Sequence, residues 1–342
     1  MKPAPIMLMA GGTGWEVVWL GTHAGLEARV VPAAGIEVEW ISVAGLRGKG
    51  LRTWLLAPVH LATALWQALA AMRRRRPAAV LGMGGYVSGP GGIAARLLGR
   101  PLLIHEQNSV AGLTNRVLAR AALRVLTGFP GVLERGEWIG NPVRAAIAEL
   151  PTPSARMLGR TGPLRVLVLG GSQGASALNA AVPRAVAALQ GGERPEVRHQ
   201  CGPRHLVDAR AAWASVGIEL EPLPFIDDMA EAYAWADLVV CRAGALTVAE
   251  LAAAGVASVL VPFPAAVDDH QTSNARFLSD AGAAELLPQH ELNSDRLAQR
   301  LRAYANDRGR LLEMAEAARA LARPHATADL AGACVHAAEG RA

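Results

Sequence analysis

The sequence predicts an α/β protein made of two parallel-sheet domains that face a central cleft. Strand-length apolar runs alternate with helical stretches along all 342 residues, which is typical of parallel α/β architecture. The length suits about two domains, and 51% of the residues are hydrophobic, so large cores can form. Each half also begins with an apolar run that enters a glycine turn, MLMAGGTG at 7–14 and VLVLGGSQG at 166–174.

The first half opens with two apolar runs that no helix separates. Residues 6–10 and 17–20 have the length and composition of buried strands, with only GGTGWE at 11–16 between them. Parallel strands need a crossover of roughly a dozen residues. A hairpin at 11–14 could join them instead, but it would reverse one strand of a parallel sheet. Four more strands are predicted in this half, at 37–41, 79–82, 101–105 and 124–127.

The second half restarts after a stretch rich in Pro, Gly and Ser, ELPTPSARMLGRTGP at 149–163. Its predicted strands are 164–170, 197–201, 218–220, 238–241, 258–261 and 284–287. The predicted division is an N-terminal domain at 1–150, a linker at 151–163, a C-terminal domain at 164–323 and a C-terminal helix at 324–342. We expect this Ala-rich helix to pack back on the N-terminal domain.

The composition indicates the redox state of the compartment and disfavours one class of partner. The net charge is +5, the aromatic content is 4%, and no recognition motif accompanies the charge, which disfavours nucleic acid as a partner. Cys201, Cys241 and Cys334 are scattered, so they indicate no disulfide framework and fit a reducing compartment. The apolar run near the N-terminus is too short for a signal peptide.

One segment has the length of a membrane span. TWLLAPVHLATALWQALAAM at 53–72 holds no charged residue, but Pro58 and several polar residues interrupt it, and an amphipathic helix is favoured. Its apolar stripe consists of Leu55, Val59, Ala62, Trp66 and Leu69, flanked by Leu65, and it is followed by Arg73, Arg74, Arg75 and Arg76. The stripe either faces a core or lies on an anionic membrane surface.

Two strand-to-helix turns in the second half predict a phosphate site. LGGSQGASALNAAV at 169–182 turns through glycines and Ser172 into a helix, whose free N–H groups attract an anion. LVVCRAGALTVAEL at 238–251 repeats this geometry and places Thr247 and Glu250 in the first turns of a helix. Glu250 either complements the helix dipole or accepts hydrogen bonds from a ribose diol.

Polar residues also gather in the first half. The segment 80–97, VLGMGGYVSGPGGIAARL, is rich in glycine and so has few side chains. It could approach a phosphate or a bulky ligand closely, although a tight surface turn is equally compatible. LLIHEQNSVAGLTNRVLA at 102–119 places four adjacent polar side chains at the carboxyl end of a strand, and His105 beside Glu106 could be a general base.

A third polar group follows a strand of the second half. PFPAAVDDHQTSNARFL at 262–278 holds Asp268, Asp269 and His270, but it lacks the DxD or HxxxH spacing of a metal site. Sugar hydroxyls suit Gln271 and Asn274 better.

Together these motifs resemble one known family. MAGGTG, GMGGYVSGPGG, HEQNSVAGLTNR, GNPVR, GGSQGA, RAGALTVAEL and DDHQTSNA occur here in the order in which the MurG family of peptidoglycan N-acetylglucosaminyltransferases has them. The resemblance spans nearly the whole chain. It implies the GT-B fold, with two Rossmann-like domains around a cleft. It also implies transfer of GlcNAc from UDP-GlcNAc to the MurNAc 4-hydroxyl of lipid I, giving lipid II by inversion and without a metal or another cofactor.

The resemblance implies a place and partners as well. Members of this family act as peripheral proteins on the cytoplasmic face of the bacterial inner membrane. The partners would be an anionic membrane surface and other cell-wall synthesis and division proteins. The membrane contact would combine Trp54 with the apolar stripe and the four arginines.

Roles for individual residues follow from the same resemblance. The donor would be bound by Thr13, Gly14, Asn108, Arg144, Ser172, Ile226, Ala245, Leu246, Thr247, Val248, Ala249, Glu250 and Gln271. The acceptor would meet Gly84, Gly85, Tyr86 and Asn115, with His105 and Glu106 as catalytic candidates. In the donor set, Ile226 would read uracil through its backbone, Glu250 would bind the ribose, and Ser172 would contact the diphosphate.

The chain departs from the family at its first turn. The family continues from GGTG into Gly-His-x-Phe-Pro-Ala and a full helix, whereas this chain passes from Gly14 to Trp15 and the second strand. The missing segment includes a histidine that is a leading candidate for the base. We therefore expect weakened packing of the first domain and reduced transfer. The alternative is a catalytically inactive remnant that binds UDP-GlcNAc at a membrane surface.

Overall fold

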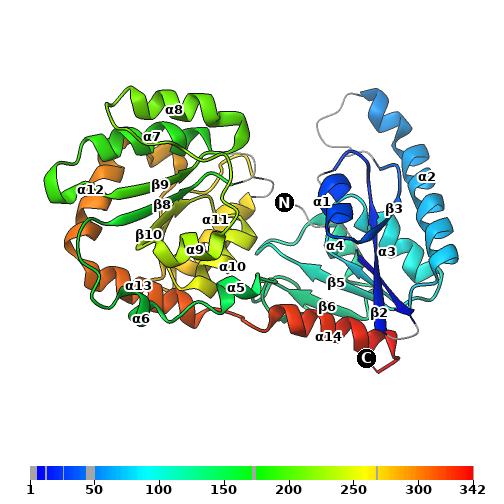
Figure 1. Ribbon diagram of the computed structural model, residues 1–342. Helices are drawn as coiled ribbons and strands as arrows, with labels where there is room; N and C mark the ends of the chain where they lie inside the picture. The colour runs from blue at the N-terminus through cyan, green and yellow to red at the C-terminus, as the bar shows by residue number, and fades with distance from the viewer. Residues whose placement is uncertain are drawn as a thin grey trace. The chain divides into compact units, whose positions relative to one another are not determined.

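The chain forms two compact units, which are described separately below (Figure 1). The computed structural model describes residues 6–11, 14–25, 27–43, 51–171, 175–266 and 269–341, and for 6–11 and 51–56 it describes only the backbone. Unit 1 is Met1–Gly140 with His325–Ala342, and unit 2 is Asn141–Pro324.

Unit 1 is built on one sheet in the order β3-β2-β1-β4-β5-β6-β7. The strands are β1 (Ile6–Gly11), β2 (Gly14–Gly21), β3 (Glu37–Trp40), β4 (Ala79–Gly82), β5 (Leu102–Glu106), β6 (Arg124–Thr127) and β7 (Gly136–Trp138). From β4 to β7, and between β2 and β3, neighbouring strands are parallel, as the alternation of strands and helices predicts.

Strand β1 is the exception, because it runs antiparallel to both of its neighbours. It pairs with β2 in the register Ile6↔Trp19 to Gly11↔Gly14, and with β4 from Ile6↔Leu81 to Leu8↔Ala79. Residues 12–13, which join β1 to β2, lie outside the described residues. A connection of two residues suffices for a hairpin but not for a parallel crossover. The sheet therefore contains the reversed strand that a hairpin at this turn requires.

Helices cover both faces of this sheet. They are α1 (Glu27–Ala33), α2 (Leu51–Arg75), α3 (Ser88–Leu97), α4 (Leu113–Leu118) and α14 (Ala326–Ala338). Successive residues of a strand point to opposite faces. Leu102 and Ile104 accordingly share a core with α2 and α3, whereas Leu103 shares a core with α14. Buried residues of α14 in that second core are Leu330, Ala333, Cys334 and Ala337. Helix α14 is thus part of unit 1, next to β4 and far from it in sequence.

Helix α2 exposes part of the apolar stripe. Val59 is 61% exposed and Trp66 is 68% exposed, while Leu65 and Leu69 are half-buried against the core. The buried face of α2 consists of Ala64, Ala68, Ala71 and Met72. The stripe therefore does not face the core as a whole, because small alanines, rather than Val59 and Trp66, form the face that packs. The side chains of Trp54 and Leu55 lie outside the described residues.

Two of the four arginines at the end of α2 form ion pairs within unit 1. Arg74 pairs with Glu39, and Arg75 pairs with Glu39 and Glu37. Within the part of the chain that the structure describes, no helix has the combination of length and hydrophobicity that crossing a bilayer requires.

Unit 2 is built on a parallel sheet in the order β12-β11-β10-β8-β9. The strands are β8 (Arg165–Leu169), β9 (Glu196–Gln200), β10 (Leu238–Cys241), β11 (Ala257–Leu260) and β12 (Ala284–Leu286). The helices are α5 (Ala145–Ala148), α6 (Pro153–Met157), α7 (Ser176–Ala187), α8 (Leu206–Ala214), α9 (Met229–Trp235), α10 (Ala245–Ala254), α11 (His270–Ser279), α12 (Ser294–Asn306) and α13 (Arg308–Ala320).

The strand predicted at 218–220 is wrong. These residues lack regular structure, and the chain meets the edge strand β9 through a single bridge, Gln200 to Leu223. The short apolar run at 218–220 packs only partly on the core, with Ile218 and Leu220 at its margin.

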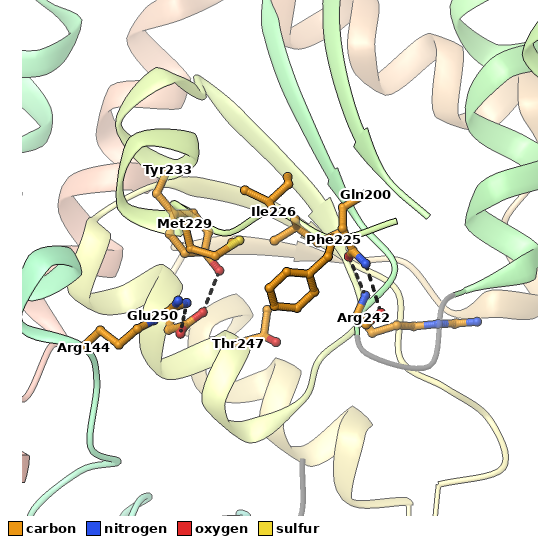
Figure 2. Close-up of a pocket in the computed structure, with 11 residues that line it drawn as sticks. Arg144, Gln200, Phe225, Ile226, Met229, Tyr233, Arg242, Thr247 and Glu250 are labelled. Atoms are coloured by element: carbon orange, nitrogen blue, oxygen red, sulfur yellow. Dashed lines mark hydrogen bonds and ion pairs between the residues drawn. The ribbon is translucent and has the colours of Figure 1, made fainter. Parts of the chain in front are cut away.

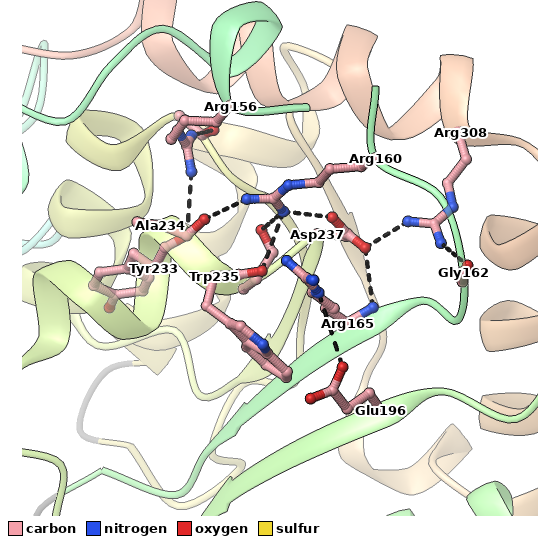
Figure 3. A network of polar contacts seen from close by, with 12 residues as sticks. Arg156, Arg160, Gly162, Arg165, Glu196, Tyr233, Ala234, Trp235, Asp237 and Arg308 are labelled. Carbon is pink, nitrogen blue, oxygen red and sulfur yellow. Dashed lines mark hydrogen bonds and ion pairs between the residues drawn. The ribbon is translucent and has the colours of Figure 1, made fainter. Parts of the chain in front are cut away.

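The segment predicted as a linker, 151–163, lies inside unit 2 and is tied down by arginines (Figure 3). Arg156 donates to the carbonyl of Tyr233 at 3.1 Å and to those of Ala254 and Gly255 at 2.6 Å each. Helix ends leave such carbonyls without partners, and arginine satisfies them well. Burial lowers the pKa of Arg156 to about 10, so it remains charged near neutral pH.

Asp237 is the buried carboxylate that binds the arginines of the same network. Its side chain is only 2% exposed, and it accepts from Arg160 at 2.6 Å and from Arg308 at 2.5 Å. The backbone N–H of Arg165 also donates to it at 3.0 Å (Figure 3). Two cations and an amide thus compensate one buried carboxylate, which joins 151–163 to the start of β8 and to α13.

Candidate functional site

A pocket of about 160 Å³ opens in unit 2 where three neighbouring strands end (Figure 2). We call it the carboxyl-end pocket. Leu169 ends β8, Gln200 ends β9 and Arg242 follows β10, and all three line it. The other lining residues are Arg144, Gly171, Phe225, Ile226, Met229, Tyr233, Thr247 and Glu250. Ligands of parallel α/β sheets bind at this edge.

Glu250 lies between two hydrogen-bond donors in this pocket (Figure 2). Arg144 Nη2 donates to its Oε1 at 3.0 Å, and Tyr233 Oη donates to its Oε2 at 3.1 Å. The side chain of Glu250 is 20% exposed, so part of it remains accessible from solvent. A carboxylate in this setting can accept hydrogen bonds from the hydroxyls of a ligand.

Gln200 connects two walls of the pocket. Its Oε1 accepts from the N–H of Gly171 at 3.1 Å, and its Nε2 donates to the carbonyls of Gly171 and Pro224 at 3.2 and 3.1 Å. Gly171 has φ +76°, a conformation that glycine adopts without strain. The glutamine therefore fixes the start of the glycine turn against the segment that carries Phe225 and Ile226.

Two helices begin at this edge of the sheet. Helix α10 starts at Ala245 after Gly244, and α7 starts at Ser176 after the glycine turn. The N-terminal amides of a helix attract negative charge. Two helix N-termini therefore lie at the edge of the sheet where the sequence predicts a phosphate site, and Ser172 itself lies outside the described residues.

A buried histidine, His199, forms a hydrogen bond to the first turn of α7. His199 Nε2 bonds to Asn179 Oδ1 and His199 Nδ1 accepts from Trp213 Nε1, both at 2.9 Å. Asn179 in turn donates to the carbonyl of Cys201 at 3.2 Å. Burial lowers the pKa of His199 to about 4, so the ring is neutral at pH 7 and uses one nitrogen as donor and the other as acceptor.

Several donor residues implied by the resemblance meet in this pocket, and others do not line it. Arg144, Ile226, Thr247 and Glu250 are lining residues. Gln271 Oε1 instead accepts from the N–H of Phe263 at 2.9 Å. Ala245, Leu246, Val248 and Ala249 lie on α10, Asn108 and Gly14 belong to unit 1, and Thr13 lies outside the described residues.

Sequence reasoning missed several lining residues, above all Tyr233 and Gln200. Tyr233 lies in the short helix α9, in the run EAYAWAD, and nothing in that pattern indicates a partner for its hydroxyl. Gln200 did carry a signal, since it is a polar residue next to the carboxyl end of the strand predicted at 197–201.

The two catalytic candidates in unit 1 are both enclosed. His105 is 0% exposed, with Nε2 at 2.9 Å from the carbonyl of Gly140 and Nδ1 at 3.1 Å from Gln107 Nε2. Burial lowers its pKa. A general base must reach the proton that it removes. This placement argues against the hypothesis that His105 is the base, because both ring nitrogens already have partners and neither meets solvent.

Glu106 is enclosed in the same way. It is 3% exposed and accepts from the N–H groups of Asn108 and Gly112 at 3.0 and 3.1 Å and from Asn115 Nδ2 at 2.8 Å. Through these bonds Glu106 fixes the conformation of the loop at 107–112. Of the expected acceptor residues, Gly84 and Gly85 have φ +79° and +84°, Tyr86 is 50% exposed and Asn115 is buried.

Two models of one protein family match the chain, one in each half. Residues 165–330 match the glycosyltransferase family 28 C-terminal domain, and residues 6–127 match the glycosyltransferase family 28 N-terminal domain.

Curated relatives match almost from end to end. A protein of Alkalilimnicola ehrlichii is 58% identical, over 97% of this chain and 98% of its own length, and one of Aromatoleum aromaticum is 59% identical, over 96% and 92%. Both are named UDP-N-acetylglucosamine--N-acetylmuramyl-(pentapeptide) pyrophosphoryl-undecaprenol N-acetylglucosamine transferase. The alignment with a relative of Azoarcus spans 353 positions, more than the 342 residues here, so that relative has residues without a counterpart in this chain.

Solved structures agree on the fold. The crystal structure of MurG from Acinetobacter baumannii has a TM-score of 0.79 and 41% identity, covering 94% of this chain and 91% of that one. The glycotransferase of kitacinnamycin has a TM-score of 0.62 at 19% identity, covering 92% and 90%, which is a likeness of fold alone.

Proposed function

This chain belongs to glycosyltransferase family 28, and from that membership we propose that it transfers GlcNAc from UDP-GlcNAc to lipid I, giving lipid II and UDP. The observation that carries the proposal is the 58% identity, across 97% of the chain, to a relative whose name specifies this transfer. The two-unit α/β fold, shared with a MurG crystal structure, supports it.

The donor binds in the carboxyl-end pocket. Ile226 meets the uracil through its backbone and Glu250 accepts from the ribose, while the starts of α10 and α7, with Thr247 and Ser172, hold the diphosphate. Gln271 and Asn108 contact the GlcNAc. The pocket supports these roles because Ile226, Thr247 and Glu250 all line it.

The reaction exchanges one bond for another at the anomeric carbon. The MurNAc 4-hydroxyl attacks that carbon from the face opposite to UDP, its proton passes to a base, and the bond to the diphosphate oxygen breaks. The leaving diphosphate gains negative charge, which the helix N-termini stabilise. Gly84, Gly85, Tyr86 and Asn115 meet the acceptor in unit 1. Glu106 and His105 shape this region rather than remove the proton, because both are buried and hydrogen-bonded.

The protein works at the cytoplasmic face of the inner membrane as a peripheral protein. The exposed Val59 and Trp66 on α2, with Arg73 and Arg76 beyond them, form the contact with anionic lipid. Other cell-wall synthesis and division proteins are its partners there.

The test is transfer of labelled GlcNAc from UDP-GlcNAc to a soluble lipid I analogue by the purified chain. Formation of a lipid II analogue that depends on both substrates supports the proposal. Transfer to a different acceptor, with the lipid I analogue neither used nor inhibitory, would refute it.

A second candidate is a protein that binds UDP-GlcNAc without turnover. The reversed strand β1 favours it, because β1 runs antiparallel to β2 and β4, whereas the resemblance implies a loop and helix between the first two strands. The same assay separates the two, since this candidate predicts donor binding by calorimetry and no product.

A further inference from the structure

The two oxygens of the Glu250 carboxylate have partners of different kinds. Tyr233 is 0% exposed and reaches Oε2 from inside unit 2, whereas the side chain of Arg144 is 52% exposed and reaches Oε1 from the surface (Figure 2). An exposed ion pair contributes little and can exchange its partners. A buried hydroxyl has no water to replace its acceptor. The bond from Tyr233 to Oε2 is therefore the harder one to replace, whereas Oε1 can exchange Arg144 for another donor.

Tyr233 is fixed relative to Glu250 by its backbone as well. Arg156 donates to the carbonyl of Tyr233 on α9 and to the carbonyls of Ala254 and Gly255 at the end of α10. Glu250 lies on α10, so one guanidinium joins the two helices that carry the hydroxyl and the carboxylate. Burial and the Glu250 charge raise the pKa of Tyr233 well above its usual value, which keeps the hydroxyl protonated as a donor.

We propose that Tyr233 is a positioning residue for the sugar nucleotide: its hydroxyl holds Glu250 Oε2 so that Oε1 accepts from the ribose diol. This inference rests on the proposed function. Arg144 leaves Oε1 when the nucleotide enters, and the bond to Tyr233 then keeps the carboxylate in one orientation. Without that bond the carboxylate rotates, and the donor must order it on binding.

The chain contains a matched control for this hydrogen bond. Tyr304 Oη donates to Glu285 Oε2 at 2.9 Å, and Arg300 pairs with Glu285 Oε1 at 2.6 Å. The arrangement repeats that of Tyr233, Glu250 and Arg144 in the same unit. These residues are not among those that line the carboxyl-end pocket. Tyr304→Phe therefore removes an equivalent bond at a distance from the nucleotide.

The experiment compares Tyr233→Phe with Tyr304→Phe in the full chain. Calorimetry measures the affinity for UDP and for 2′-deoxy-UDP, and the transfer assay measures KM and kcat. For Tyr233→Phe we expect UDP affinity to fall and KM for UDP-GlcNAc to rise, each roughly tenfold, with kcat nearly unchanged. The preference for UDP over 2′-deoxy-UDP should shrink. Tyr304→Phe should change none of these, and in a Glu250→Ala background Tyr233→Phe should have no further effect on UDP affinity.

Two results would overturn the inference alone. One is a Tyr233→Phe chain with the affinity and ribose preference of the wild type. The other is an equal loss in Tyr304→Phe, which would indicate a general effect on unit 2. A wild-type chain that binds no UDP would overturn the proposed function together with the inference.

Discussion

His199 shows how one buried side chain can shape the carboxyl-end pocket without lining it. It joins Asn179 at the start of α7 to Trp213 on α8, and only the neutral ring satisfies both bonds. Protonation would place a second donor against the indole N–H of Trp213, since Trp has no acceptor to offer. The charge state of this ring is therefore linked to the folding of unit 2.

That linkage predicts an acid sensitivity. The folded pKa of about 4 lies below the usual 6.5, so the unfolded state binds more protons between these values and stability falls as the pH drops from 6.5 towards 4. At pH 5 the loss is about 2 kcal/mol. Urea unfolding of unit 2 at pH 7 and pH 5 measures it. His199→Gln, which keeps a donor and an acceptor, should lose less stability over this interval. An equal loss in both chains would contradict the assignment.

Predictability at this scale depends on whether the backbone pattern reveals the role. Glu250 and Thr247 could be found because a strand, a glycine turn and a helix fix their place at the edge of the sheet. Tyr233 could not, since its role depends on α9 and α10 lying side by side. For His105 the sequence indicates its place near the carboxyl end of a strand, but it does not show that both ring nitrogens have hydrogen-bond partners.

At the scale of elements, the strands and helices of unit 2 largely follow their predicted places, and the failures have physical causes. The strand predicted at 218–220 does not form, because the chain reaches β9 only beyond it, through one isolated bridge at Leu223. The linker at 151–163 has the composition of a flexible segment, yet Arg156 and Arg160 bind helix-end carbonyls across unit 2. Composition reports local preference and says nothing of such distant acceptors.

A prediction about membrane binding follows from the exposed residues of helix α2. Replacing Val59 and Trp66 by Ser leaves the buried alanine face intact, because both side chains are exposed. We expect binding to vesicles containing anionic phospholipid to weaken roughly tenfold, since two apolar anchors are lost. Vesicle co-sedimentation measures this. The control is the double change of Leu158 and Val207 to Ser, two residues of unit 2 that are 85% and 77% exposed. An equal loss in the control, or no loss in the α2 variant, would refute the membrane contact.

For the whole molecule, the largest consequence follows from the junction between β1 and β2. Inserting a loop and helix of the family type between Gly14 and Trp15 supplies the crossover that a parallel β1 needs. We expect the inserted chain to unfold at a higher urea concentration and to transfer GlcNAc at least about tenfold faster, because packing and a base are restored. Denaturation and the transfer assay, with a Gly/Ser insert of equal length as control, measure both. A chain that gains nothing over this control would show that β1 is functional as it stands.

Unit 1 is assembled from two distant stretches of chain, and this sets an order of events during synthesis. The ribosome delivers Met1–Gly140 first, but Leu330, Ala333 and Ala337 of α14, which cover one face of its sheet, come after all of unit 2. Unit 2 is continuous from Asn141 to Pro324 and can close while translation proceeds. The nascent first sheet meanwhile leaves Leu81, Leu103 and Leu126 uncovered. The unit expected to receive the acceptor can therefore complete its core only after unit 2 has been synthesised.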